Sequence, residues 1–400
     1  MQRRVVITGV GAVTPLGVGA RTLHTRWCGG DVGIADGLGR CDDFEPTDHL
    51  PKKLVRRSDR FSQFALAACA EAMEQAGWED GELPYDPDYV GVIVGTGIGG
   101  IGTLLHGHDL MNDEGAHKVS PLAIPLMMSN AAAGALSLRY GLRGVSYAPT
   151  SACAAGAHSI GAAARAIAAG DCDAVVTGGS EAAHVAISHA AFRQMDALST
   201  EGVSRPFDKR RDGFVMGEGA GILILEDGDK AQARGAEILG EILGYGATSD
   251  AHHITAPSSE GAVRAMKLAL RDAGLEPEDV DYVNAHGTST PLNDASETRA
   301  IKAVLGDHAY KVPVSSTKSA IGHLLGASGA VEAVATVQAL RERVAPPTCG
   351  WEERDEELDL DYVPDGPRPL TTANGRAVAL SNSFGFGGHN AVLCIGSEAE

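Results

Sequence analysis

The stretch PTSACAAGAHSIGAAARAIAAG, residues 149–170, places one cysteine among small residues at the start of a predicted helix. The helix is predicted over Cys153–Ala169, with Gly170 as its C-cap. A cysteine in a first helical turn faces unpaired N–H groups and the positive end of the helix dipole, which lower its pKa and favour the thiolate. A cysteine among alanines is more often a buried small hydrophobe. The stretch by itself leaves both interpretations of Cys153 open.

Two histidines occur in turns that follow predicted strands. His286 lies in NAHGTST, residues 284–290, and His323 closes SSTKSAIGH, residues 315–323, which also contains Lys318. In α/β sheets, ligands bind at such strand-to-helix turns. Each histidine alone is more often structural, and a lone lysine is often an ordinary surface residue. Together with a cysteine at a helix start, these residues indicate one catalytic site.

Two further segments extend the predicted site. Glu332 follows His323 by nine residues on a predicted helix, about 13 Å of helical rise away. We therefore expect Glu332 to pair with Lys318 rather than with His323, and a solvated glutamate is the alternative. In NSFGFGGHN, residues 382–390, glycine-flanked N–H groups can approach a ligand oxygen closely. The alternative for this segment is a hairpin turn with a packed aromatic side chain.

Length and composition narrow the class of protein. The 400 residues are 44% hydrophobic and carry a net charge of −19, which argues against sequence-independent binding to nucleic acid or to an acidic membrane. The seven scattered cysteines include no C-x-x-C pair, so they indicate neither a disulfide framework nor a zinc site and favour a reducing cytoplasm. We expect neither a signal peptide nor a membrane span.

Short β-branched runs alternate with Ala-rich segments of helical period, the pattern of an α/β chain with a buried sheet. The predicted strands are Arg4–Thr8, Val90–Gly95, Ala174–Gly178, Gly221–Glu226, Glu237–Tyr245, Asp281–Ala285, Val312–Ser316, Ala377–Ser381 and Ala391–Ile395. Besides the helix at the cysteine, the predicted helices are Arg60–Ala76, Gly261–Ala273, Ala295–Val304 and Leu324–Arg341. The segment LGYGATSD marks a soft boundary near residues 240–250.

Two glycine motifs raise other functions. GTGIGG, residues 95–100, matches the G-x-G-x-x-G pattern after a predicted strand, which makes a nicotinamide-dependent dehydrogenase an alternative. The region from His106 to Asp113 shows no clean amphipathic helix, and a single match is weak in a chain with 51 glycines. GGSEA, residues 178–182, lacks the closing glycine of a nucleophile elbow, which disfavours an α/β-hydrolase.

Five segments resemble the signatures of elongating β-ketoacyl-acyl-carrier-protein synthases. They are TSACA (150–154), RPFDKRRDGFVMGEGAG (205–221), NAHGTST (284–290), STKS with GHLLGA (316–319 and 322–327) and NSFGFGGHN (382–390). The similarity covers essentially the whole chain and follows the order of that family. It implies an α/β thiolase fold of two similar βαβαβαββ halves in a five-layer α-β-α-β-α arrangement, usually as a homodimer. Residues 1–245 would carry the cysteine, and residues 246–400 would carry the two histidines.

The resemblance also implies a reaction and the roles of its central residues. Cys153 would accept an acyl chain from an acyl carrier protein as a thioester. His286 and His323 would stabilise the enolate that forms when malonyl carrier protein loses its carboxylate. The N–H groups of Cys153 and Phe386 would form the oxyanion hole. No metal and no dissociable cofactor would be required, because phosphopantetheine arrives on the carrier protein.

Supporting roles follow from the same resemblance. Electrostatic support of the site would come from Lys318 and Glu332. Substrate contacts would come from Ile98, Thr288, Thr290, Phe384 and Phe386. Docking of the acidic carrier would involve Lys53, Arg56, Arg57 and, more weakly, Arg205, so that a local basic patch offsets the acidic chain.

Three features distinguish this chain within the superfamily. Both histidines are present, whereas initiating synthases carry Asn at one position, and Cys153 is present, whereas chain-length factors lack it. With 400 residues, we expect none of the fused domains that modular polyketide synthases carry. His389 stands where many relatives have Thr. We expect a discrete cytoplasmic fatty-acid elongation enzyme, with a ketosynthase of a type II polyketide or polyene pathway and a non-catalytic partner subunit as alternatives.

Overall fold

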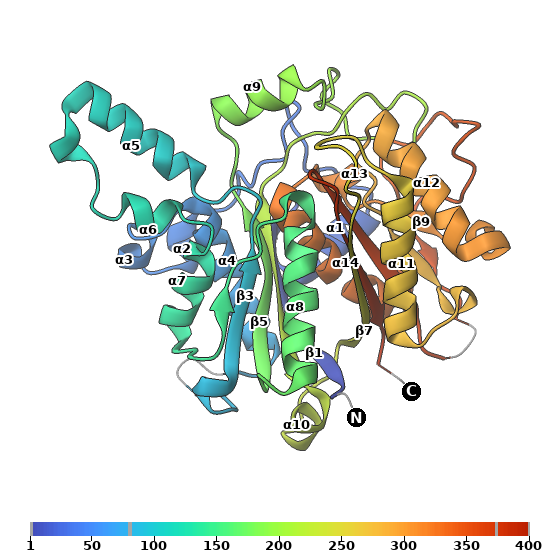
Figure 1. Ribbon diagram of the computed structural model, residues 1–400, viewed down its shortest axis with the longest axis horizontal. Coiled ribbons are helices and arrows are strands. Elements are labelled where there is room, and N and C mark those ends of the chain that lie inside the picture. Colours follow the sequence, from blue (N-terminus) through green and yellow to red (C-terminus); the bar gives the residue numbers. More distant parts are fainter. Residues whose placement is uncertain (1–2, 79–81, 373–374, 399–400) are drawn as a thin grey trace.

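Two repeats of strands and helices meet at neighbouring central strands in this computed structural model, which describes residues 3–78, 82–372 and 375–398 (Figure 1). The first repeat contains β1 (Val5–Thr14), α4 (Arg60–Gln75), β3 (Val90–Gly95), α7 (Ala131–Tyr140), β4 (Ser146–Tyr147), α8 (Ala155–Ala169), β5 (Ala174–Glu181) and β6 (Gly219–Asp227). The second contains β7 (Gly240–Ser249), α11 (Ser259–Ala273), β8 (Tyr282–Asn284), α12 (Pro291–Leu305), β9 (Val314–Ser315), α14 (Ser328–Glu342), β12 (Val378–Gly385) and β13 (His389–Gly396).

The strand order is a mirror image about the junction of the two repeats. The order is β4-β3-β5-β6-β1 in the first repeat and β7-β13-β12-β8-β9 in the second, and β1 pairs antiparallel with β7 between them. Each repeat thus follows the predicted βαβαβαββ sequence of elements. The exact division into residues 1–245 and 246–400 stays a prediction. The second repeat begins with β7 at Gly240, so the predicted boundary falls inside this strand.

Helices cover both faces of each half of the sheet, which confirms the predicted five layers. α4 packs on β1 and β6 outside the first half, and α11 packs on β7 and β13 outside the second. The central layer is α8 and α14, which contact each other and strands of both halves, and Figure 1 shows α8 running alongside β5. This layer is rich in alanine, which lets the two halves of the sheet and the central helices approach closely. The start of each central helix carries part of the predicted site.

Several predicted elements differ from the structure at their ends. β1 runs on to Thr14, beyond its predicted end at Thr8. Gly9 and Gly11 lie inside the strand because α4 presses on it: an added Cβ would stand 1.9 Å from the Ala72 carbonyl oxygen and 2.0 Å from that of Ala68. Glycine is required here for close packing rather than for a turn.

Two helices differ from the sequence prediction. α12 begins at Pro291 because Thr290 caps the Asn293 N–H and proline suits the first helical turn. The region after GTGIGG is a helix after all, α5 (Ile101–Glu114), and the absence of an amphipathic pattern reflects its lack of buried residues. Figure 1 shows α5 extending away from the body of the molecule.

The remaining elements connect the layers. Helices outside the repeats are α1 (Ala20–Cys28), α2 (Pro46–His49), α3 (Lys52–Val55), α6 (Ala123–Met127), α9 (Ala186–Gln194), α10 (Gly228–Ala233) and α13 (Lys318–Ile321). Short strands are β2 (Gly17–Val18), β10 (Val344–Ala345) and β11 (Arg368–Pro369). The first and last strands lie on either side of β7: Val6 of β1 and Gly396 of β13 both pair with Glu241 of β7.

Candidate active site

Cys153 lies in a tight turn directly before α8. The turn Ala152–Ala154 is a single 3-10 turn, and Ala152 has a left-handed φ of 51°, an unusual conformation for a residue with a side chain. The sulfur accepts hydrogen bonds from the N–H groups of Cys153 and Phe386. Gly385 permits this approach, because an added Cβ would stand 3.0 Å from the Ser151 carbonyl oxygen. The Cys153 turn and the β12–β13 turn are therefore packed against each other.

The pKa of Cys153 shifts in the direction opposite to the one predicted from its helix start. Burial raises this pKa to about 11, while the charge of Lys318 and the two N–H groups lower it. Desolvation outweighs the local attraction because the thiol is 7% exposed. The expectation of a resting thiolate is wrong, and the free protein holds Cys153 as a neutral thiol.

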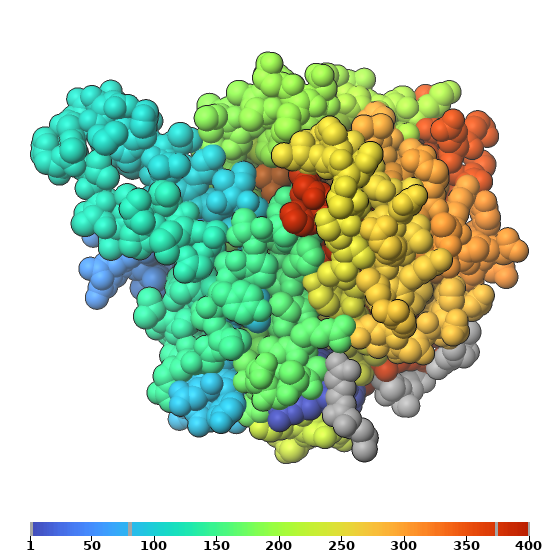
Figure 2. All heavy atoms as spheres, in the orientation of Figure 1, coloured from blue at the N-terminus to red at the C-terminus, as the bar shows by residue number. Residues whose placement is uncertain are grey.

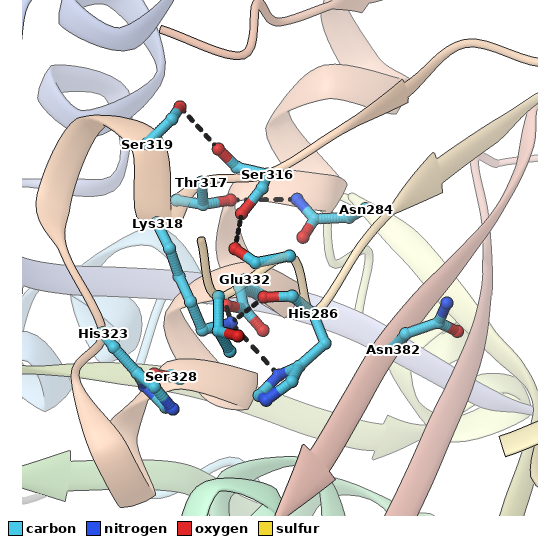
Figure 3. A network of polar contacts seen from close by, with 12 residues as sticks. Asn284, His286, Ser316, Thr317, Lys318, Ser319, His323, Ser328, Glu332 and Asn382 are labelled. Atoms are coloured by element: carbon cyan, nitrogen blue, oxygen red, sulfur yellow. Dashed lines mark hydrogen bonds and ion pairs between the residues drawn. The ribbon is translucent and has the colours of Figure 1, made fainter. Parts of the chain in front are cut away.

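His286 is held by Lys318, which is itself paired with Glu332 (Figure 3). The Lys318 Nζ donates to His286 Nδ1 at 3.2 Å and to the His286 carbonyl oxygen at 2.7 Å, and it forms a buried ion pair with Glu332 Oε1. The predicted contact between Lys318 and Glu332 is therefore present. Burial raises the pKa of Glu332, and the charge of Lys318 opposes that rise.

His323 is fixed from its other side by groups that follow it in the chain. Its Nδ1 accepts the Leu325 N–H at 3.1 Å and lies 2.9 Å from the Ser328 hydroxyl. Leu325 has a left-handed φ of 48°, so the turn after His323 folds back on the ring. Sequence reasoning missed Ser328, because the helix was predicted to begin at Leu324, whereas α14 begins at Ser328.

The contacts of both rings assign the same tautomer. An ammonium group and a backbone N–H can only donate, so Nδ1 accepts in His286 and in His323. Burial lowers the pKa of each histidine well below its ordinary value, and the charge of Lys318 lowers both further. Each ring is therefore neutral with its proton on Nε2. The ring centroids are 5.4 Å apart, which suits two donors for one substrate oxygen.

Two buried carboxylates on α12 hold the turn that carries His286. Glu297 accepts the N–H groups of His286 at 2.8 Å and Gly287 at 2.7 Å, and Asp294 accepts the Thr288 N–H at 3.0 Å. Burial raises the pKa of Glu297 to about 7 and that of Asp294 to about 6. The sequence analysis did not select them, although their spacing of three residues places both on one face of a helix.

The site opens into a cavity of about 400 Å³. Its lining includes Gly97, Ile98, Cys153, Phe192, Phe214, His286, Thr288, Thr290, His323, Leu325, Phe384 and Phe386. All the predicted catalytic and substrate-contact residues except the buried Lys318 and Glu332 thus reach one cavity. Figure 2 shows this face hollowed beside atoms from the C-terminal part of the chain (red) and the segment near residue 250 (yellow). The segment 382–390 is both a hairpin turn and part of the cavity wall.

The two basic segments of the sequence differ in the structure. Lys53, Arg56 and Arg57 are exposed on and after α3, and within the described residues none of the three has an ion-pair partner. The second segment is neutralised: Lys209 pairs with Glu353 at 3.0 Å and Arg211 with Asp355 at 2.7 Å.

Arg205 needs a correction as a docking candidate. Its side chain is 6% exposed and pairs with Glu201 at 2.8 Å. A buried, paired guanidinium offers no free charge at the surface, so Arg205 does not join the exposed basic residues near α3.

The glycine-rich loop GTGIGG is occupied by a carboxylate of the protein itself. Glu181, the last residue of β5, accepts the N–H of Gly97 at 2.7 Å and those of Ile98 and Gly99 at 3.3 Å. These are the groups that a dinucleotide phosphate would need. The loop is therefore a wall of the cavity rather than a phosphate site, which removes the support for a dehydrogenase.

Within the described ranges, His, Cys, Asp and Glu side chains form no group of three suited to a metal ion. Over the same part of the chain, no helix is long and apolar enough to cross a membrane.

The doubled α/β fold and the cysteine facing two neutral imidazoles define a class: acyl-transferring enzymes of the thiolase fold. Two family models that match the chain identify the family within this class. "Beta-ketoacyl synthase, N-terminal domain" matches residues 37–231, and "Beta-ketoacyl synthase, C-terminal domain" matches residues 239–352. The chain belongs to the β-ketoacyl synthase family.

Curated relatives are similar over nearly the whole chain. The 3-oxoacyl-[acyl-carrier-protein] synthase 2 of Synechocystis sp. is 48% identical over 416 residues, covering 98% of this chain and 98% of the relative. The enzyme of the same name from Staphylococcus aureus strain COL is 45% identical over 410 residues, covering 98% and 97%. The resemblance found in the sequence is confirmed.

Solved structures agree with the thiolase fold. The ishigamide ketosynthase/chain length factor has a TM-score of 0.91 at 33% identity, and a β-ketoacyl synthase from Burkholderia phymatum STM815 has a TM-score of 0.90 at 33% identity. A type II polyketide ketosynthase in complex with its acyl-carrier protein has a TM-score of 0.89 at 30% identity. Each comparison covers 100% of both chains.

Proposed function

We propose that this protein is an elongating β-ketoacyl-acyl-carrier-protein synthase, an acyltransferase that performs decarboxylative Claisen condensation in fatty acid synthesis. One observation carries the proposal: a buried cysteine and two neutral histidines, each with its proton on Nε2, line the same cavity. A thiol that stores an acyl group and two aligned donors that stabilise an enolate are the parts this reaction needs.

The first half of the reaction moves the acyl chain to the enzyme. The Cys153 sulfur attacks the thioester carbonyl of an acyl carrier protein, and the carbonyl oxygen takes the negative charge of the tetrahedral intermediate. The N–H groups of Cys153 and Phe386 support that oxygen, since both already point at the sulfur. The pantetheine sulfur leaves, and the proton of Cys153 ends on it.

The second half forms the carbon–carbon bond. The thioester oxygen of malonyl carrier protein accepts hydrogen bonds from the Nε2–H groups of His286 and His323. Loss of CO₂ leaves an enolate that these two donors stabilise, and its carbon attacks the acyl group on Cys153. The Cys153 sulfur leaves and takes up a proton, which restores the thiol. Every atom of the 3-oxoacyl product comes from the two thioesters, so the reaction as written needs no metal and no dissociable cofactor.

Supporting residues keep this geometry. Lys318 holds the Nδ1 of His286 and keeps it an acceptor, and Glu332 balances the lysine charge. Thr288 and Thr290 are hydrogen-bonded to each other at 2.9 Å on the cavity wall, where they can contact the pantetheine arm. Ile98, Phe384 and Phe386 supply apolar contacts for the acyl chain.

An acyl carrier protein is the proposed partner. Carrier proteins are acidic, and the exposed basic cluster of Lys53, Arg56 and Arg57 carries no internal counter-charge in the described residues. On a chain of net charge −19, such a patch is what would steer an acidic partner toward the site. We infer a cytoplasmic setting, which the free thiols of all seven cysteines support.

A homodimer completes the proposal. β4 lies at one end of the strand order and exposes its backbone edge, with Tyr147 47% exposed. The arm formed by α5 and α6 has no buried residue and exposes Leu104 and Ile124. A second copy of this chain would cover both. Sedimentation equilibrium should then give twice the 41.3 kDa of one chain, and a monomer at micromolar concentration would contradict the dimer.

Mass spectrometry after incubation with a long-chain acyl carrier protein tests the function. We expect an acyl adduct on Cys153 and its transfer to malonyl carrier protein as a 3-oxoacyl product. Absence of any adduct would contradict the enzyme and favour a non-catalytic partner subunit. A ketosynthase of a polyketide or polyene pathway is the second candidate, because one similar solved structure is a type II polyketide ketosynthase with its acyl-carrier protein and another is a ketosynthase/chain length factor. Loading of poly-3-oxo chains in preference to saturated ones would favour it.

A further inference from the structure

Glu181 is a buried carboxylate whose two oxygens both accept several hydrogen bonds. It ends β5 and has no exposed area. Its Oε1 accepts the Thr96 hydroxyl at 2.9 Å and the N–H groups of Ile98 and Gly99 at 3.3 Å. Its Oε2 accepts the N–H groups of Gly97 at 2.7 Å and Gly326 at 3.1 Å. Burial raises the pKa of this carboxyl, and these hydrogen bonds oppose the rise.

The donors come from two segments that are far apart in the sequence and meet at this carboxylate. Residues 96–99 form the part of the cavity wall that carries Ile98. Gly326 belongs to the turn that follows His323 and contains Leu325, another cavity residue. The segments touch directly, because a Cβ on Gly326 would stand 2.0 Å from the Gly97 nitrogen. One side chain therefore fixes the acyl wall and a catalytic turn together.

The turn at Gly326 also determines how His323 is held. Leu325 has a left-handed φ of 48°, a conformation that costs energy unless neighbouring contacts impose it. Its N–H donates to His323 Nδ1, and the next N–H, of Gly326, donates to Glu181. Removing the Glu181 contact frees the turn at Gly326. The adjacent residue, Leu325, is the one whose N–H keeps the His323 proton on Nε2.

The electrostatic effect of Glu181 works against the nucleophile. Its negative charge contributes to raising the pKa of Cys153. Its contribution to the site is therefore geometric, through the segments it holds.

We propose that Glu181 is a positioning residue that couples acyl-chain selection at Ile98 to the orientation of His323. This inference rests on the proposed function, since it concerns the same two thioester substrates. Movement of the 96–99 segment changes the shape of the acyl wall. The same movement reaches the turn that holds the His323 ring, so chain-length preference and decarboxylation change together.

The test compares Glu181→Gln with a matched control, Glu226→Gln. In Glu181→Gln, one carboxylate oxygen becomes an NH₂ group. In either orientation of the amide, this NH₂ group faces N–H donors that the oxygen accepted before. Glu226 is also fully buried and lies on the paired strand β6, but it binds Thr8, Tyr85 and Arg234, outside the cavity. Both variants remove one buried carboxylate charge. Only Glu181→Gln releases segments of the active site.

Two quantities are measured in each variant. The first is the ratio of kcat/KM for loading Cys153 from sixteen-carbon and eight-carbon acyl carrier proteins. The second is malonyl carrier protein decarboxylation in a Cys153→Gln background. For Glu181→Gln we expect both to change by about tenfold or more, because small displacements of catalytic groups are costly. For Glu226→Gln we expect both to stay within about twofold, even where thermal stability falls.

The outcomes separate the proposals. A Glu181→Gln variant with wild-type values of both quantities, a change in only one of them, or equal changes in Glu226→Gln would overturn the coupling. If Glu181→Gln does not fold, Thr96→Val removes a single Oε1 donor and should change both quantities in the same direction, and unchanged values would again overturn it. Failure of the wild type to acylate Cys153 would instead overturn the proposed function.

Discussion

At the scale of single residues, the reactivity of Cys153 is a balance between burial and nearby charge. Burial raises its pKa to about 11, and Lys318 is the group that most opposes this rise. The sequence predicted the local contribution, a helix start with free N–H groups, but it could not predict the larger one. Desolvation depends on residues such as Phe214 and Leu325, which long-range packing brings to the cavity.

Alkylation of Cys153 should therefore show no plateau near neutral pH. Because only the thiolate reacts, the rate with iodoacetamide should rise about tenfold per pH unit between pH 7 and pH 9. Mass spectrometry of the Cys153 peptide measures the rate, and Cys153→Ala gives the background from the partly exposed Cys28 and Cys349. A rate that levels off below pH 8 would contradict the raised pKa.

The histidines should act in decarboxylation rather than in acyl storage. Cys153→Gln should keep malonyl decarboxylation and lose condensation, because the two donors remain while the nucleophile is gone. His286→Ala or His323→Ala should lower decarboxylation by about 10²-fold or more, the usual effect of removing one oxyanion donor. Release of CO₂ from labelled malonyl carrier protein measures this. Unimpaired decarboxylation in either histidine variant would refute the assigned role.

The site residues differ in how far sequence could predict them. Cys153, His286 and His323 stand in distinctive local motifs, and the Lys318–Glu332 contact follows from helical rise and charge. Ser328, Glu297 and Glu181 act through hydrogen bonds to backbone groups of other segments. Such contacts depend on tertiary structure, and nothing in the neighbouring sequence marks them. Arg205 was selected for its charge, whereas only the fold shows that it is buried and paired.

At the scale of secondary-structure elements, the close crossing of α8 and α14 brings the two halves of the site together. An added Cβ on Gly156 of α8 would stand 2.7 Å from the Ala330 nitrogen of α14. An added Cβ on Gly329 of α14 would stand 2.9 Å from the Ala157 nitrogen of α8. Each helix thus offers a glycine to the backbone of the other. The first turns of both helices lie next to the catalytic turns as a result.

A methyl group at this crossing should separate the helices. We expect Gly156→Ala to lower the free energy of unfolding by about 1–3 kcal/mol, since the obstacle is backbone that cannot rotate away. Gly134→Ala on α7 is the control: nothing lies within 4 Å of its added Cβ, and removing a helical glycine should stabilise by about 0.5–1 kcal/mol. Urea denaturation measures both. Equal effects of the two variants would contradict the close crossing.

The predicted elements were most accurate where burial and period agree. β3 was predicted with its observed bounds because VGVIVG is a continuous apolar run buried on both faces. α5 was missed because none of its residues is buried and it carries no amphipathic stripe. β1 was predicted to end at Thr8, whereas the strand continues through Gly9 and Gly11, which lie in close contact with α4. A periodic pattern of apolar residues thus reflects burial of one face. It does not predict a helix that is exposed or a strand that contains glycines for close packing.

At the scale of the whole molecule, the distribution of charge matters more than its total. The chain has a net charge of −19, and the basic segment near residue 210 is neutralised by the acidic segment near residue 354. The basic cluster at α3 keeps its charge. Sequence alone could not separate these two segments, because both look equally basic and only the fold supplies the counter-charges of one.

Reversing the charge at α3 should slow association with the carrier. We expect Arg56→Glu with Arg57→Glu to reduce the association rate by about tenfold or more at low salt, with a smaller effect at high salt. Lys267→Glu with Arg271→Glu on α11 makes the same change in net charge on a surface far from α3 (Figure 1). Stopped-flow binding of a fluorescent carrier measures both. An equal reduction in both variants would indicate net charge alone and contradict local docking.

β1 and β13 pair with β7 on either side of Glu241, and this allows the order of the two repeats along the chain to be changed. Val6 and Gly396 flank one residue of β7, so these two residues lie about two strand spacings, ~10 Å, apart. A short peptide can join them, and new ends can be opened at the exposed Gly235 between the repeats. The resulting circular permutant would begin with the histidine-bearing repeat and end with the cysteine-bearing one. Its activity would show that the order of the repeats along the chain is dispensable.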